Sequence, residues 1–142
     1  MATICKEIEI GRSKAFVWDA IRDVGQIHER LVPGFIVNCV LEDGARTVTF
    51  DNGMVVRELI VDVDDKTCRH SWATHDKPFI HYNASAQVFS SGPDKCRVVW
   101  IADLLPNELA DGIAETIQRG LNIMKQTLER RGPPMSTIKP GD

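Results

Sequence analysis

Residues 107–131 read NELADGIAETIQRGLNIMKQTLERR, and their pattern decides the fold of this chain. Apolar side chains recur every three or four residues, as expected of a helix with one buried face. This stripe consists of Leu109, Ile113, Ile117, Leu121 (or Gly120), Met124 and Leu128. Asn107 is the expected N-cap, and Gly132-Pro133-Pro134 ends the helix because glycine is a common helix stop and proline prevents its resumption. A helix from Glu108 to Arg131 would be about 36 Å long, enough to cross a whole sheet.

The segment from residue 35 to residue 105, which precedes this helix, is predicted to contain only strands. Turn signals separate them, and Asp51-Asn52-Gly53 is the strongest because Asn-Gly readily adopts the positive φ values of a tight hairpin. Short strands joined by hairpin-length turns indicate an antiparallel meander. The six predicted strands are Phe35–Glu42, Arg46–Phe50, Met54–Val63, Thr67–Thr74, Phe79–Phe89 and Cys96–Leu105.

The N-terminal part adds one strand and two helices. Thr3–Ile10 alternates apolar and charged residues as a strand does. Ser13 is the expected cap of a helix that ends at Gly25, and a short helix from Gln26 to Leu31 stops before Pro33-Gly34. The order strand, two helices, six strands and long helix predicts an α+β fold in which one helix covers a curved antiparallel sheet. A single helix covers such a sheet only partly, which leaves a ligand-sized cavity between them.

Length and composition fit a single globular domain. The chain has 142 residues, of which 43% are hydrophobic and 26% charged. Residues 1–132 are the expected domain and residues 133–142 a flexible C-terminal tail. The net charge is -3 and the basic residues are scattered, so no nucleic-acid partner is expected. No stretch approaches the ~18 apolar residues that span a bilayer, so stable membrane insertion is not expected either.

The spacing of the cysteines and histidines matches no cofactor-binding motif, so no cofactor is expected. Cys5, Cys39, Cys68 and Cys96 all lie in predicted strands and form no C-x-x-C pair, which favours reduced, buried thiols in a cytoplasmic protein. The N-terminus lacks the apolar run of a secretory signal. The histidines have no ligand spacing, so no metal site is expected.

Four short pieces of the chain carry a resemblance to a known superfamily. They are Val17-Trp18-Asp19-Ala20-Ile21, Val56-Arg57-Glu58-Leu59 leading to Asp64-Asp65, Tyr82-Asn83-Ala84-Ser85, and Gly120-Leu121-Asn122-Ile123-Met124-Lys125. In this order and spacing the chain resembles the START-like SRPBCC superfamily, in particular bacterial polyketide cyclase/dehydrase-like proteins, over about residues 4–131. The superfamily also includes pollen allergens, lipid-transfer domains and abscisic-acid receptors. The resemblance implies the helix-grip fold and a cavity for an apolar ligand.

The receptor branch of the superfamily implies three pocket positions. It places a pocket glutamate at Glu58, a pocket tyrosine at Tyr82 and an aromatic wall at Trp72. The lysine that meets a ligand carboxylate in the receptors falls at Pro33, and the hairpin at residues 51–53 is too short for their gating loop. The resemblance therefore implies the pocket and not the hormone-receptor mechanism.

Strand alternation selects further cavity residues. His70 and Trp72 share one face of their strand, and Tyr82 shares a face with Ala84, where small side chains leave room. Trp100 is assigned to the cavity side of its strand because the other face of that strand carries the charged residues Arg97 and Asp103. In the strand Met54–Val63 both faces carry apolar groups, and the resemblance favours the face with Glu58.

Small residues on the long helix, spaced four apart, are expected to keep it from filling the cavity. The complete set of predicted ligand-binding residues is Phe35, Val56, Glu58, Ile60, His70, Trp72, Tyr82, Ala84, Trp100, Gly112, Thr116, Ile117, Gly120 and Met124.

Three of these residues have candidate chemistry, each with an alternative. Burial in an apolar pocket would raise the pKa of Glu58 and make it a general acid or base, whereas pairing with an arginine or exposure to solvent would make it an ordinary carboxylate. His70 is either a proton shuttle or a structural strand residue. Tyr82 either donates its hydroxyl to a ligand oxygen or anchors the last helix.

Three functions follow from these predictions. The first is binding of a small hydrophobic molecule such as a lipid, a polyketide-like or an aromatic compound. The alternative is a polyketide cyclase or dehydratase that uses Glu58, His70 and Tyr82 as acid/base and positioning groups. The third is a domain with a collapsed cavity that acts through partner contact, and a homodimer also remains open.

Overall fold

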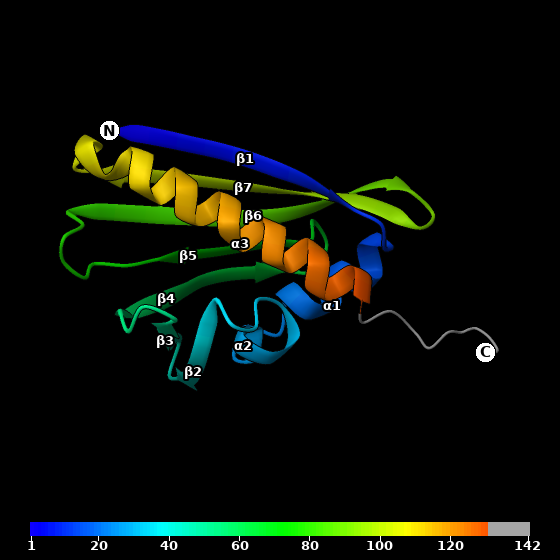
Figure 1. Ribbon diagram of the computed structural model, residues 1–142, viewed down its shortest axis with the longest axis horizontal. Helices are drawn as coiled ribbons and strands as arrows, with labels where there is room; N and C mark the ends of the chain where they lie inside the picture. The colour runs from blue at the N-terminus through cyan, green and yellow to red at the C-terminus, as the bar shows by residue number, and fades with distance from the viewer. Residues whose placement is uncertain (131–142) are drawn as a thin grey trace.

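The computed structural model describes residues 1–130 as a single curved antiparallel sheet crossed by a long helix (Figure 1). The strand order across the sheet is β1-β7-β6-β5-β4-β3-β2, so every sequential pair from β2 to β7 forms a hairpin. The α+β helix-grip prediction, with its order of one strand, two helices, six strands and a long helix, is confirmed. The elements are β1 (Ala2–Ile10), α1 (Lys14–Ile21), α2 (Ile27–Arg30), β2 (Ile36–Glu42), β3 (Ala45–Phe50), β4 (Val55–Asp64), β5 (Arg69–Ala73), β6 (His81–Gly92), β7 (Lys95–Leu105), η1 (Asn107–Leu109) and α3 (Ala110–Arg130).

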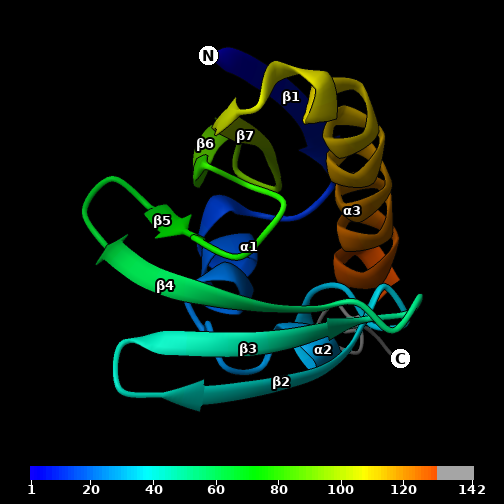
Figure 2. The same ribbon diagram turned by 90° about the vertical axis from the view of Figure 1, so that its left-hand side faces the viewer.

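The sheet curls far enough that its two ends face each other. In Figure 2, β2 and β3 lie opposite β1 and β7, and α3 closes the open side between them. The apolar stripe of α3 packs inward, with Ile117, Leu121 and Leu128 at most 2% exposed. Burying such side chains contributes on the order of 2 kcal/mol each, which is what holds the helix on the sheet.

The long helix begins differently from the prediction. Asn107 does not cap it, because residues 107–109 form a 3-10 turn that follows Pro106 and has no side-chain cap. The α-helix starts at Ala110. At the first helix the predicted cap is confirmed, since Ser13 accepts a hydrogen bond from the Phe16 N–H at 3.2 Å.

Two other boundaries also differ. Helix α1 ends at Ile21 rather than at Gly25, and the Val24 carbonyl beyond its end accepts a hydrogen bond from Arg46. Cys68 lies in the turn before β5 and not in a strand, with a left-handed φ of 54°. The Asp64 carboxylate holds this turn by accepting from the Lys66 N–H and the Thr67 hydroxyl, both at 2.9 Å.

Two sequence predictions concern membranes and the C-terminus. None of the helices within residues 1–130 is long and apolar enough to cross a membrane. The predicted flexible tail, residues 133–142, lies outside the described residues.

Candidate functional site

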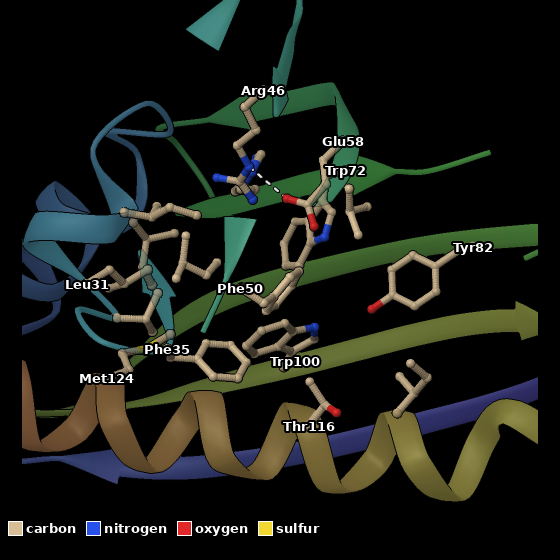
Figure 3. Close-up of a pocket in the computed structure, with 18 of the residues that line it drawn as sticks. Leu31, Phe35, Arg46, Phe50, Glu58, Trp72, Tyr82, Trp100, Thr116 and Met124 are labelled. Carbon is tan, nitrogen blue, oxygen red and sulfur yellow. Dashed lines mark hydrogen bonds and ion pairs between the residues drawn. The ribbon is translucent and has the colours of Figure 1, made fainter. Parts of the chain in front are cut away.

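A cavity of about 140 Å³ lies between the sheet and α3 (Figure 3). The interior is therefore not filled by side chains, which contradicts a collapsed cavity. Most of its wall is apolar, and six of its side chains are aromatic rings of Phe, Tyr or Trp. The lining residues are Ile21, Ile27, Leu31, Val32, Phe35, Ile36, Arg46, Phe50, Met54, Val56, Glu58, His70, Trp72, Phe79, Tyr82, Ala86, Trp100, Ile113, Thr116 and Met124.

The register of β6 with its two neighbours, β5 and β7, leaves part of the cavity open. Ala86 on β6 pairs with His70 on one side and with Trp100 on the other. All three side chains point inward, so a methyl group lies between two large rings. The short alanine leaves room above β6, as the sequence predicted for the small residues of this strand.

The cavity has a buried end and a mouth. Leu31 and Val32 are 7% and 4% exposed at the buried end beside α2. At the other end Met54 is 47% exposed, and Phe79 and Ile113 are partly buried. The mouth therefore lies between the β3–β4 hairpin, the loop before β6 and the first turns of α3.

A buried ion pair forms one part of the cavity wall. The Arg46 Nε donates to Glu58 Oε1 at 2.8 Å, and the two side chains are 5% and 13% exposed. Register places them together, because Arg46 on β3 is the direct partner of Glu58 on β4. Arg46 also donates to the Val24 carbonyl at 3.1 Å. The pairing of Glu58 with an arginine, the alternative to an isolated buried acid, is thus confirmed, and the pair adds no net charge to the cavity.

His70 is a neutral, buried side chain at neutral pH. Burial, and to a smaller degree the charge of Arg46, lowers the pKa of His70 to about 4. The ring stacks on Trp72 with centroids 4.9 Å apart. Its Nδ1 is 3.1 Å from the Asp62 carbonyl, which can only accept, so Nδ1 carries the proton and Nε2 is an acceptor. At pH 7 His70 therefore offers a neutral imidazole whose buried Nε2 accepts and has no partner within residues 1–130.

Tyr82 presents a neutral phenol to the cavity. Burial, with a smaller contribution from the charge of Glu58, raises the pKa of Tyr82, so the hydroxyl keeps its proton. Its ring packs against Phe79 with centroids 4.8 Å apart. The hydroxyl has no hydrogen-bond partner within residues 1–130, which leaves it available to a ligand.

Trp100 lies with its benzo edge against α3. A Cβ atom added at Gly120 would be 3.3 Å from the Phe35 ring and 3.4 Å from Trp100 Cζ3. The absence of a side chain at Gly120 therefore lets two aromatic rings reach the helix, rather than leaving open space as the sequence predicted. The Trp100 indole N–H is buried and has no hydrogen-bond partner in the described part of the chain.

The structure brings most of the predicted ligand-binding residues to one cavity. Those that line it are Phe35, Val56, Glu58, His70, Trp72, Tyr82, Trp100, Thr116 and Met124.

Five predicted residues lie outside the cavity lining: Ile60, Ala84, Gly112, Ile117 and Gly120. Ile60 lies at the bulge between residues 60 and 62 of β4, where the register with β5 shifts. Ala84 and Ile117 are 1% and 2% exposed and belong to the packed core. Gly112 is exposed, and a Cβ there would meet nothing within 4 Å.

Several lining residues were missed by the sequence reasoning. Arg46 is the most important of them. Aligning the two strands on either side of the turn at residues 51–53 would have placed Arg46 opposite Glu58. Phe50, Met54 and Phe79 at the mouth flank turns, where alternation does not predict which way a side chain faces. The residues of α2 and its flanks were missed because a helix of four residues has no readable periodicity.

A family model matches residues 1–129, under the description polyketide cyclase / dehydrase and lipid transport. The chain belongs to this family. None of the curated proteins matches it.

Solved structures of similar proteins share the fold. An uncharacterized protein from Bacillus thuringiensis has a TM-score of 0.81 at 18% identity, over 89% of this chain and 98% of that one. The di-domain ARO/CYC protein BexL from the BE-7585A biosynthetic pathway has a TM-score of 0.79 at 17% identity. The match covers 94% of this chain and 48% of that one. Truncated norcoclaurine synthase from Thalictrum flavum has a TM-score of 0.70 at 17% identity, over 94% of both chains. At these identities the likeness shows the fold alone.

Proposed function

We propose that this protein binds a small, neutral, largely apolar molecule with a ring-sized core in the cavity between the sheet and α3. The observation that carries the proposal is an apolar, aromatic-walled cavity of about 140 Å³ whose two charged residues neutralise each other. An apolar cavity of about 150 Å³ in another protein holds one benzene molecule. Longer ligands would extend through the mouth at Met54.

A binding titration tests this function. Toluene and naphthalene, added to the purified protein, are expected to displace an environment-sensitive apolar dye and to quench the fluorescence of Trp72 and Trp100. A Trp18→Phe background removes the tryptophan that lies outside the cavity. The matched control is Ala86→Leu, which fills the space between His70 and Trp100 and should weaken binding at least tenfold. Absence of dye uptake and quenching for both compounds would contradict the proposal.

A cyclase or dehydratase is the second candidate function. The observation that favours it is that Glu58, His70 and Tyr82 line the same cavity. In this version the Glu58 carboxylate, paired with Arg46, acts as a base, and Tyr82 donates a hydrogen bond to the reacting oxygen. His70, neutral at pH 7, positions the substrate by accepting a hydrogen bond at Nε2. Turnover that persists unchanged in Glu58→Gln would exclude this assignment, whereas loss of turnover with retained binding would support it.

We also propose the cytoplasm as the protein's compartment. All four cysteines are free thiols, and three of them are buried. Free thiols persist in a reducing compartment. Fractionation of the native host that finds the protein outside the cytoplasm would contradict this.

A further inference from the structure

The cavity contains a hydrogen-bond donor that the protein itself leaves without a partner. The Trp100 indole nitrogen is buried and makes no hydrogen bond within residues 1–130. An indole N–H donates and never accepts. Leaving such a group unpaired is unfavourable, because its hydrogen bond to water is lost on folding and nothing replaces it. Only a group that enters the cavity can recover this energy.

A second free donor lies nearby. Figure 3 shows the Tyr82 hydroxyl and the indole nitrogen of Trp100 directed toward the same part of the cavity, above α3. The strands keep this arrangement, because Tyr82 on β6 pairs with Leu104 and Trp100 on β7 pairs with Ala86. The raised pKa of Tyr82 keeps its hydroxyl protonated, so both groups are donors at neutral pH.

The position of the indole is fixed by its surroundings. Its Cζ3 edge would lie 3.4 Å from a Cβ at Gly120, and its ring meets the Trp72 ring edge-on at a centroid distance of 5.5 Å. A ring held from two sides keeps its N–H pointing in one direction, which lowers the entropy cost of hydrogen bonding to a ligand.

We infer that Trp100 and Tyr82 form a binding site for a carbonyl oxygen, so that the preferred ligands are neutral aromatic or alicyclic ketones. This inference rests on the proposed function, because it specifies which polar group the apolar ligand carries. A carbonyl oxygen has two lone pairs and accepts from two donors at once. A carboxylate would add a net negative charge to an apolar cavity whose only guanidinium, among the lining residues described, is already paired with Glu58.

The test compares acetophenone with α-methylstyrene, which has the same shape but a methylene group in place of the oxygen. Tyr82→Phe removes only a hydroxyl and is expected to weaken acetophenone binding about fivefold, as for one neutral hydrogen bond. It should change the affinity for α-methylstyrene less than twofold. Comparing each ligand between the two proteins cancels the difference in hydration of the two ligands.

A spectroscopic readout reports on Trp100 itself. The three tryptophans give three indole N–H signals in a proton–nitrogen NMR spectrum, and Trp100→Phe identifies one of them by its loss. Acetophenone should move the Trp100 indole proton downfield, and α-methylstyrene should not. The Trp18 indole, which donates to Asp65 at 2.9 Å, is the internal control.

The outcomes separate the inference from the proposed function. If both ligands bind but Tyr82→Phe weakens them equally or not at all, or if both move the Trp100 proton alike, the carbonyl site is wrong and the cavity function stands. If neither ligand changes any tryptophan signal, the proposed function itself is contradicted.

Discussion

Arg46–Glu58 and Arg22–Asp65 are two ion pairs with the same 2.8 Å distance between Nε and a carboxylate oxygen. The first lies in the cavity wall with side chains 5% and 13% exposed, and the second lies on the surface with side chains 47% and 60% exposed. Water solvates the surface pair whether or not it forms. The cavity pair loses most of its hydration on folding, and replacing such a pair by apolar residues is often neutral or stabilising. The comparison indicates that the buried pair shapes the cavity rather than stabilising the fold.

Breaking the buried pair has the largest expected effect. Glu58→Leu leaves the Arg46 guanidinium uncompensated in the cavity wall and is expected to cost about 3–5 kcal/mol of unfolding free energy. Urea unfolding at pH 7 measures the loss. A cost below about 1 kcal/mol, the range of exposed pairs, would show that the two pairs behave alike.

The matched control removes both charges. Arg46→Met combined with Glu58→Leu replaces the pair with side chains of similar size, and we expect the double variant to recover most of the stability lost in the single variant. A double variant as unstable as Glu58→Leu would contradict this expectation, because loss of the Arg46 contact with the Val24 carbonyl would then cost as much as the uncompensated charge.

The next effect concerns pH and the buried histidine beside this pair. The pKa of His70 is lowered from 6.5 to about 4 in the folded protein, so the unfolded chain binds the additional proton first as the pH falls. The contribution of neutral His70 to stability is therefore complete above pH 6.5 and is lost as the pH falls toward 4. At pH 5 the loss amounts to about 2 kcal/mol relative to pH 7.

Removing the imidazole isolates this effect from that of the carboxylates. His70→Asn should have a smaller fall in unfolding free energy between pH 7 and pH 5 than the unchanged protein, and His75→Asn serves as the control on an exposed histidine. Equal falls in all three proteins would contradict a lowered pKa for His70.

The smallest expected effect is at the surface pair. Asp65→Asn keeps an oxygen that accepts from the Trp18 indole but loses the charge that faces Arg22. We expect a small loss of stability that disappears in 1 M salt, because exposed charges are screened over about 3 Å at that ionic strength. A loss as large as that of Glu58→Leu would remove the contrast between the two pairs.

The fold could be predicted because its signals are periodic and local. The stripe of α3 and the turn at residues 51–53 identify the helix and the sheet without any contact information. Alternation also placed His70, Trp72 and Tyr82 on the cavity side, since neighbouring side chains of a strand point to opposite faces.

The chemistry of the site depends on contacts that local patterns do not contain. Glu58 was recognised as facing inward, but its ion pair follows from the β3–β4 register that brings Arg46 opposite it. Ile60 was placed in the cavity because the resemblance favoured the face of β4 that carries Glu58, but Ile60 lies outside the cavity lining. Gly120 has the small size that was expected to leave space, and aromatic rings from two other parts of the chain occupy that space instead.

A crystal structure of the protein soaked in bromobenzene shows whether the cavity between the sheet and α3 binds a small aromatic molecule, because the anomalous signal of bromine locates it. We expect a bromine peak inside the cavity, between Trp72, Trp100 and α3, and loss of that peak in Ala86→Leu. A crystal that takes up bromobenzene only at surface positions, with the cavity between the sheet and α3 empty, would contradict it.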